Sequence, residues 1–368
     1  MKFLAISESG HALGLLMRLQ KEGHSTHILS NQDFGSGIID PLVDNSVSDI
    51  TIFDSNSLGA KADSMRKEGR RVLGASKWSH SLESNLEYSE SLIKSAGWPI
   101  TTGSRGINLY ITTWFNGKDY ISVYSSLVYR RFMSSGRGPD LNFTGVISLF
   151  GQEKVDKIRT TFLNPLLPIL KRTNHRGCFH IHALISETGY GVKSISASFE
   201  NPLSIFLFEN TRLSACDVLL KMFDESSTPI MPVTEWGAGV MLSVPPYPYA
   251  VNIPNKKEIS GIEQANLKHL WLVDIIRENN SYYTGLVNGK IGYVTARGAT
   301  SPSCWGYTEA TRRIYRTISN LSVPDLQYRD DVGDKISDML YILSREKWIK
   351  YALRENNSKP QSNKATIL

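Results

Sequence analysis

The sequence predicts an α/β protein in which an N-terminal doubly wound domain precedes two α+β domains. Two observations support this fold class: strands and helices alternate over residues 1–80, and antiparallel strand patterns take over after residue 106. Alternation implies a parallel sheet, because a crossover helix is the usual way to return the chain for the next parallel strand. With 368 residues, of which 41% are hydrophobic, the chain is long enough for two or three domains.

The doubly wound domain is expected over residues 1–80. A short apolar strand at 2–7 is followed by a turn at Gly10 and a helix at 13–21, in which Leu13, Leu16 and Met17 recur at helical spacing. A second helix is expected at 58–68, because Gly69 follows it and glycine commonly ends helices. The remaining strands of this domain are expected at 27–30, 49–53 and 71–73.

The central domain is expected over residues 107–225, after a helix at 82–96 and a short connector within residues 81–106. Gly97-Trp98-Pro99 ends that helix, and an antiparallel pair follows at 107–114 and 120–128 around the turn Asn116-Gly117. A polar, glycine-rich loop is expected at 134–142. The other elements expected here are strands at 146–150, 178–185 and 192–196, and helices at 153–171 and 204–222.

The third domain is expected over residues 226–353, and a polar, disordered tail over 354–368. Its strands are expected at 239–243, 271–274, 282–287 and 290–296, and its helices at 303–319 and 335–350.

Composition excludes some classes of protein. No stretch approaches the ~20 apolar residues of a membrane span, so the expected location is the cytoplasm, with no membrane partner. The cysteines, Cys178, Cys216 and Cys304, are far apart, which argues against a disulfide framework and a zinc site. The formal charge of +6 suits a phosphate-bearing ligand, but the basic residues are spread along the chain. Tyr129-Arg130-Arg131 is interpreted as a solvated loop face.

Two C-terminal strings carry a family resemblance. Residues 288–298 read N-G-K-I-G-Y-V-T-A-R-G, a helix rich in Tyr and Arg follows, and residues 328–333 read Y-R-D-D-V-G. The order resembles phosphoribosylamine-glycine ligase, an ATP-grasp enzyme of purine biosynthesis, in which N-G-G-R-V-L-x-V-T-x-x-G precedes Y-R-x-D-I-G. Two upstream segments, 115–119 and 239–248, are also similar to the family. The chain looks like a divergent, phage-type member, which would place it in a host cytoplasm.

The resemblance implies a pre-ATP-grasp domain at 1–80, an ATP-grasp-like central domain and a C-terminal α+β domain. It also implies two anion-binding segments. Ser9, Gly10 and His11 occupy the family's G-x-G-G-R-E-H-A turn, where a helix N-terminus meets a phosphate. The second segment matches the family's G-D-x-G-P-x-T-G-G-M-G loop, whose glycines let N–H groups surround an anion; its candidate residues are Gly136, Arg137, Gly138, Pro139, Thr144 and Gly145.

The chain departs from the family at its nucleotide site. Family members insert a β-rich lid that supplies lysines to ATP, whereas residues 97–106 are ten residues with one basic side chain, Arg105. The magnesium pattern E-F-N-x-R-F-G-D-P is replaced in residues 191–202 by a stretch with Lys or Ser where the acid should stand. Losing these groups would remove most transition-state stabilisation, so no catalytic residue is assigned.

Three functions remain open. The favoured hypothesis is a degenerate ATP-grasp homologue, a pseudoenzyme that binds a small phosphate-bearing ligand or a protein partner. The alternative is an active carboxylate-amine ligase that uses ATP and Mg²⁺ to join an amino acid to a nucleotide-type amine. The least favoured partner is a nucleic acid, which would stack on Trp98, Trp114, Tyr124 and Tyr129. A metal site at Cys178, His180 and His182 is also disfavoured.

Overall fold

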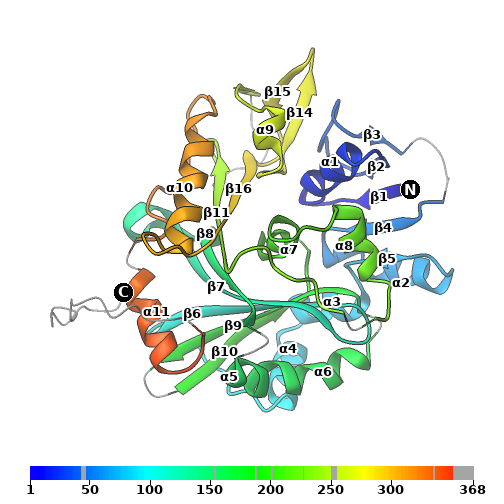
Figure 1. The fold of residues 1–368 in the computed structure, drawn as a ribbon. Coiled ribbons are helices and arrows are strands. Elements are labelled where there is room, and N and C mark those ends of the chain that lie inside the picture. Colours follow the sequence, from blue (N-terminus) through cyan, green and yellow to red (C-terminus); the bar gives the residue numbers. More distant parts are fainter. Residues whose placement is uncertain are drawn as a thin grey trace.

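The computed structural model describes residues 1–42, 47–152, 155–173, 175–186, 189–199, 202–226, 228–249, 255–334 and 336–350 (Figure 1). The tail predicted at 354–368 lies outside the described residues. Across the described residues, every helix is too short or too polar to cross a membrane.

The N-terminal sheet is parallel, as predicted. Its strand order is β3-β2-β1-β4-β5, so the chain reverses direction across the sheet at β1, which is the topology of a doubly wound domain. Helices α1 and α2 are its crossovers. The bounds are β1 Lys2–Ile6, α1 Leu13–Lys21, β2 Ser25–Leu29, β3 Asp40–Pro41, β4 Ile50–Phe53, α2 Gly59–Lys67 and β5 Val72–Leu73, with a 3₁₀ turn at Asn56–Leu58.

Two helices, α3 (Lys77–Ser84) and α4 (Leu86–Ser95), replace the single helix predicted at 82–96. The break is at Asn85, whose backbone is extended and whose side chain accepts the N–H of Tyr88 at 3.0 Å, so Asn85 caps the second helix. Ser76 caps the first helix in the same way through Ser79. The prediction missed both capping residues.

The second sheet has eight strands in the order β10-β9-β6-β7-β8-β11-β16-β13, and every neighbouring pair is antiparallel. The predicted hairpin at 107–128 is confirmed as β6 and β7. Because β11 pairs with β8, the sheet is continuous across the boundary predicted at residues 225 and 226. The bounds are β6 Ile107–Phe115, β7 Tyr120–Met133, β8 Arg137–Phe150, β9 Gly177–Ser186, β10 Gly189–Ser196, β11 Trp236–Ser243, β13 Leu270–Leu272 and β16 Lys290–Gly298.

The glycine-rich loop predicted at 134–142 is wrong for most of its length. The turn is confined to Ser134–Gly136, and β8 begins at Arg137. Ser135 and Gly136 have φ angles of 58° and 71°, which turn the chain tightly enough for β7 and β8 to pair directly. The polar residues after the turn therefore belong to a strand.

The remaining elements surround the large sheet. The helix predicted at 204–222 is interrupted where Asn210 turns its side chain to the backbone of Thr234, donating to its carbonyl at 2.8 Å. A small antiparallel sheet has the order β12-β15-β14. The bounds are α5 Asp156–Ile158, α6 Asn164–Lys171, α7 Phe206–Glu209, α8 Ala215–Lys221, β12 Glu258–Ile259, α9 Gln264–Leu267, β14 Ile275–Glu278, β15 Ser281–Thr284, α10 Gly306–Ser319 and α11 Ile336–Arg345, with a π turn at Arg159–Leu163 and a 3₁₀ turn at Pro202–Ile205.

Helix α1 docks the N-terminal domain against the large sheet. A Cβ on Gly14 would lie 3.0 Å from the Cα of Trp271 on β13, so a larger residue would fit only if the backbone of β13 moved slightly away. The guanidinium of Arg18 lies 3.9 Å from the centre of the Trp271 ring, and it also reaches the buried Glu209 at 3.5 Å. This contact fixes the distance between the two sheets.

Candidate functional site

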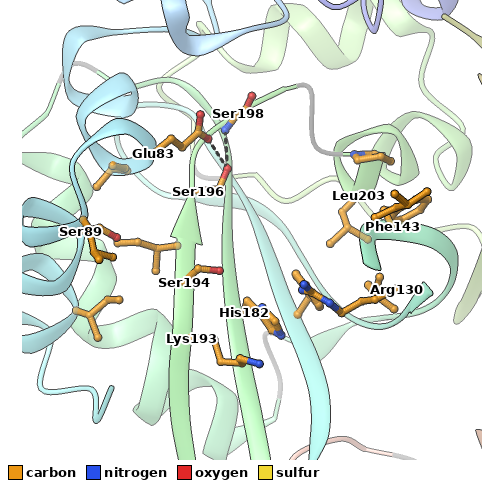
Figure 2. A pocket seen from close by; sticks show the side chains of 18 of the residues that line it. Glu83, Ser89, Arg130, Phe143, His182, Lys193, Ser194, Ser196, Ser198 and Leu203 are labelled. Atoms are coloured by element: carbon orange, nitrogen blue, oxygen red, sulfur yellow. Dashed lines mark hydrogen bonds between the residues drawn. The ribbon is translucent and has the colours of Figure 1, made fainter. Parts of the chain in front are cut away.

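A cavity of about 650 Å³ lies where the N-terminal domain meets the large sheet. His11, before α1, contributes from the first domain, and Glu83 and Glu90 contribute from α3 and α4. Five strands of the large sheet supply eight further polar lining residues: Tyr110, Arg130, His182, Lys193, Ser194, Ser196, Lys290 and Tyr293. Figure 2 shows the part of this cavity around β10.

Strand β10 has a bulge where it lines the cavity. Val192 pairs with Ala183 and Ser194 pairs with His182, so Lys193 is an extra residue between two consecutive pairs. Without a bulge, alternate residues of a strand point to opposite faces. Lys193, Ser194 and Ser196 all line the cavity, and Figure 2 shows Lys193 near His182.

Arg130, on β7, is held in place by two neighbours. It donates to the Tyr110 hydroxyl at 2.9 Å and to the Asp140 carboxylate at 3.0 Å. Burial opposes its charge, but the hydrogen bond to Asp140 and the nearby Tyr110 outweigh this and raise the pKa of Arg130. The residue interpreted as part of a solvated loop is therefore a strand residue that lines the cavity, and it stays cationic.

His182 lies between the cations. Its ring stacks on Tyr110 with a centroid distance of 4.2 Å, and Nε2 donates to the amide oxygen of Asn108 at 2.8 Å. Burial, followed by the charges of Arg130 and Lys193, lowers its pKa to about 3. His182 is therefore neutral at physiological pH, and the two neighbouring cations add to the effect of burial.

His11 lines the cavity from the N-terminal domain. Its Nδ1 lies 3.0 Å from the Ser9 hydroxyl and its Nε2 lies 3.2 Å from the Tyr293 hydroxyl. Burial, and next the charge of Lys290, hold its pKa well below the ordinary value for histidine. Both ring nitrogens of His11 already have hydroxyl partners, and the residue brings no positive charge to the cavity.

The carboxylates that line the cavity lie on the helices. Ser196 donates to Glu83 at 2.6 Å, and its hydroxyl also accepts the Ser198 N–H at 3.3 Å (Figure 2). The resemblance places magnesium ligands on β10, where this chain has Lys193 and serines. An ammonium group repels Mg²⁺, and the described residues contain no group of three His, Cys, Asp or Glu suited to a metal. These residues do not fit a magnesium ion.

The three predicted N-terminal residues lie just before α1, and a carboxylate occupies the start of this helix. Asp54, at the end of β4, accepts the Ser7 hydroxyl at 2.5 Å, the Glu8 N–H at 3.1 Å and the Ala12 N–H at 3.2 Å. Gly10 donates its N–H to the Ser7 hydroxyl at 3.0 Å. Of Ser9, Gly10 and His11, only His11 lines the cavity.

The predicted segment 136–145 lies on the β7–β8 hairpin, and its six candidate residues do not line the cavity, whereas Phe143 does. The hydroxyl of Thr144 donates to the carbonyls of Tyr129 and Arg131, both at 2.8 Å. A Cβ on Gly145 would lie 2.3 Å from Val332. The structure therefore gives Thr144 and Gly145 packing contacts within the hairpin and with the 328–333 segment.

The Y-R-D-D-V-G segment clamps the same hairpin. Arg329, which is 4% exposed, donates to the Arg131 carbonyl at 2.8 Å and pairs with Asp331 at 2.6 Å. Asp331 in turn accepts the N–H of Ser135 at 2.8 Å. This string, which carries much of the resemblance, holds two distant parts of the chain together.

Residues 97–106 form a connector along the edge of the large sheet. Within it, Ile100 makes an isolated parallel bridge to Val192, and Thr101 donates its N–H to the Val192 carbonyl at 3.0 Å. All ten residues are described, and they contain no helix and no strand longer than this bridge. Ile100, Thr101 and Thr102 line the cavity, so the connector forms part of its rim.

Sequence reasoning missed Arg130, Lys193 and Lys290 as lining residues. Alternation along β7 could have identified Arg130, but the bulge at Lys193 depends on the partner strand and leaves no local signal. Conversely, the proposed stacking residues Trp98, Trp114 and Tyr124 are at most 3% exposed and cannot present their rings to a base. His180 and Cys178 are also buried, at 2% each, where His180 contacts Thr112.

Comparison with known proteins identifies the fold. The sequence matches no protein-family profile, and it matches no curated protein significantly. Phosphoribosylamine-glycine ligase from Thermotoga maritima has a similar structure, with a TM-score of 0.67 and 14% identity over 90% of this chain and 100% of that chain. N5-carboxyaminoimidazole ribonucleotide synthetase from Thermotoga maritima has a TM-score of 0.51 and 13% identity, over 88% of this chain and 99% of that chain. The biotin carboxylase domain of a single-chain bacterial carboxylase has a TM-score of 0.55 and 10% identity, over 94% of this chain and 100% of that chain. The chain therefore has an ATP-grasp-type fold.

Proposed function

We propose that the protein binds a small phosphate-bearing ligand in the 650 Å³ cavity and does not transfer phosphate from ATP. It would be a divergent, phage-type relative of the phosphoribosylamine-glycine ligases that has kept the cavity and lost the reaction. The observation that carries the proposal is the cationic wall formed by Arg130, Lys193 and Lys290.

The wall suits a phosphate for two reasons. Arg130 has a fixed orientation, because Tyr110 and Asp140 hold its guanidinium, and a fixed guanidinium can present parallel donors to phosphate oxygens. Lys193 adds a second charge from the bulge, close enough to lower the pKa of His182. Serines 194 and 196 add hydrogen-bonding groups around the same space.

Two features support a binding role over phosphoryl transfer. Such a transfer depends on positioned cations and metal ions around the γ-phosphate, and β10 carries Lys193 and hydroxyl groups where oxygen ligands for a metal would be needed. Residues 97–106 are also too few to form a β-rich lid over a nucleotide. Both features concern residues that the structure describes, on β10 and in the connector 97–106.

Calorimetric titration of the full chain tests this proposal. The probes are inorganic phosphate, ribose 5-phosphate, AMP and ATP, each with EDTA and then with Mg²⁺. At least one probe should bind without Mg²⁺, and Lys193→Gln should weaken it about tenfold or more, since a charge-assisted hydrogen bond is lost. Lys350→Gln, at an exposed lysine outside the cavity, is the matched control.

Two outcomes would overturn it. If no probe binds at millimolar concentration, the cavity has no affinity for phosphate. If Mg²⁺-dependent ATP cleavage appears when an amino acid and an amine are added, the chain is a working ligase with a rebuilt nucleotide site.

A further inference from the structure

A second, larger cleft lies on the other side of α3. Its volume is about 1110 Å³, and its walls are α2, the segment through β5 to the start of α3, the end of α6 and the start of β9. One carboxylate, Asp63, lines this cleft. Eight cationic side chains also line it: Arg66, Lys67, Arg70, Arg71, Lys77, Lys171, Arg172 and Arg176. Eight of the 41 Lys and Arg residues of the chain line this cleft, so positive charge is concentrated here.

Three of the eight cationic side chains make hydrogen bonds to other parts of the fold. Arg66 donates to Asp63 at 2.8 Å and to the Ala75 carbonyl at 2.6 Å, while Arg176 donates to the Met222 carbonyl at 3.1 Å. Arg70 reaches the Ser48 hydroxyl at 3.4 Å. These residues shape the cleft and contribute to its field.

The other five cations are exposed, and none of them makes an ion pair with a described residue: Lys67, Arg71, Lys77, Lys171 and Arg172. Helix dipoles account for the positions of two of them. Lys67 and Lys171 are the last residues of α2 and α6, where a positive charge is stabilised by the helix dipole. The same effect disfavours Lys77, which stands at the first position of α3. A purely structural account therefore leaves Lys77 and Arg71 unexplained.

An aromatic ring completes the cleft. Trp78 is partly exposed and lines it, and its ring packs against those of His175 and Phe179, with centroid distances of 5.4 and 6.1 Å. The Phe179 ring is inclined to it by 22°, close to parallel. His175 also lines the cleft, and its Nδ1 has no hydrogen-bond partner among the described residues.

We propose that this cleft binds single-stranded nucleic acid, with Lys67, Arg71, Lys77, Lys171 and Arg172 contacting phosphates and Trp78 stacking on a base. A cationic groove beside a supported aromatic ring is the arrangement that binds single strands with little sequence preference. A single strand is needed because the stacked neighbours inside a duplex cover both faces of each base and leave none for the ring. This cleft shares no lining residue with the phosphate cavity, so either proposal can fail alone.

Fluorescence anisotropy with labelled oligonucleotides tests it on the full chain. The single strand should bind more tightly than a duplex of the same length. For about five phosphate contacts, affinity should fall by roughly 100-fold between 50 and 200 mM salt. Lys67→Glu/Lys171→Glu should weaken binding by about tenfold or more, because two attractive contacts become repulsive.

Matched variants separate the cleft from general charge and from misfolding. Arg316→Glu/Lys350→Glu makes the same change in net charge at exposed positions outside the cleft and should bind as the unmodified chain does. Trp78→Leu should weaken binding about fivefold or more while inorganic polyphosphate, which has no bases, binds as before. A bromouracil-containing strand should cross-link at Trp78.

The proposal is overturned if oligonucleotides do not bind, if the two double variants lose the same affinity, or if duplex and single strand bind equally. It is also overturned if Trp78→Leu leaves oligonucleotide affinity unchanged, since the cleft would then be a site for polyanions in general.

Discussion

The carboxylate of Asp54 accepts the hydroxyl hydrogen bond of Ser7 at 2.5 Å, which joins the ends of two neighbouring strands, β1 and β4. The same carboxylate receives two backbone N–H groups before α1, so an internal anion occupies the start of that helix. Asp54 is fully buried, and burial raises its pKa despite these hydrogen bonds.

Replacing Asp54 should therefore destabilise the N-terminal domain. Asp54→Ala leaves the Ser7 hydroxyl and the N–H groups of Glu8 and Ala12 without an acceptor, and we expect a loss of about 2–4 kcal/mol in the free energy of unfolding, measured with urea. Asp338→Ala, on the exposed side of α11, should change it by no more than about 0.5 kcal/mol. Equal losses in the two variants would contradict this role for Asp54.

Acidification should destabilise the protein through its buried histidines. Burial is the main cause that lowers the pKa of His175 to about 4 and of His180 and His182 to about 3, so the folded chain binds fewer protons than the unfolded chain below pH 6.5. The stabilising contribution is complete above that pH and is lost as the pH falls, by about 1.4 kcal/mol per pH unit for each histidine.

His175→Gln tests this pH dependence. Between pH 7 and pH 5, its free energy of unfolding should fall less steeply than that of the unmodified chain, by the slope of one histidine. His80→Gln, on the exposed side of α3, is the matched control for the substitution. An unchanged slope in His175→Gln would show that His175 does not exclude a proton.

Arg329 should stabilise the β7–β8 hairpin from a distance of about 200 residues in sequence. Arg329→Ala removes the donor to Arg131 and leaves Asp331 unpaired, and we expect a loss of about 2–4 kcal/mol together with faster amide exchange in the hairpin. Arg312→Ala, whose side chain is 73% exposed, should cost less than about 0.5 kcal/mol. Unchanged exchange in the hairpin would rule out the clamp.

Gly145 and Val332 should be energetically coupled. A Cβ at residue 145 would lie 2.3 Å from Val332 Cγ2, so Gly145→Ala should cost about 1–3 kcal/mol through overpacking. Val332→Ala removes that methyl group, and the double variant should recover at least about 1 kcal/mol relative to the sum of the single changes. A double-mutant cycle measured by urea unfolding checks this, and additive effects would exclude the contact.

Local pattern was sufficient for the parts of the fold that depend on neighbouring residues. The alternation of strands and helices predicted the doubly wound domain, and the turn at Asn116-Gly117 predicted the β6–β7 hairpin; both are confirmed. Asn85 is a residue type that commonly caps helices, so the break there could have been predicted. The apolar residues on either side continue the helical spacing, and this led to the prediction of a single helix.

The cavity depended on relationships that no local pattern contains. Lys193 lines it at a bulge of β10 against β9, and Lys290 reaches it because β16 pairs with β11 across the large sheet. The second cleft is harder still to predict, because its cations come from segments about 100 residues apart and look evenly spread along the chain.

Helix α3 is the common wall of the two clefts: Lys77 and Trp78 at its start line one, and Leu82 and Glu83 near its end line the other. Five or six residues separate these positions, which is about 8 Å along a helix axis. A ligand that shifted α3 from one cleft would also shift residues that line the other, and thermodynamic linkage would make such an effect on affinity reciprocal.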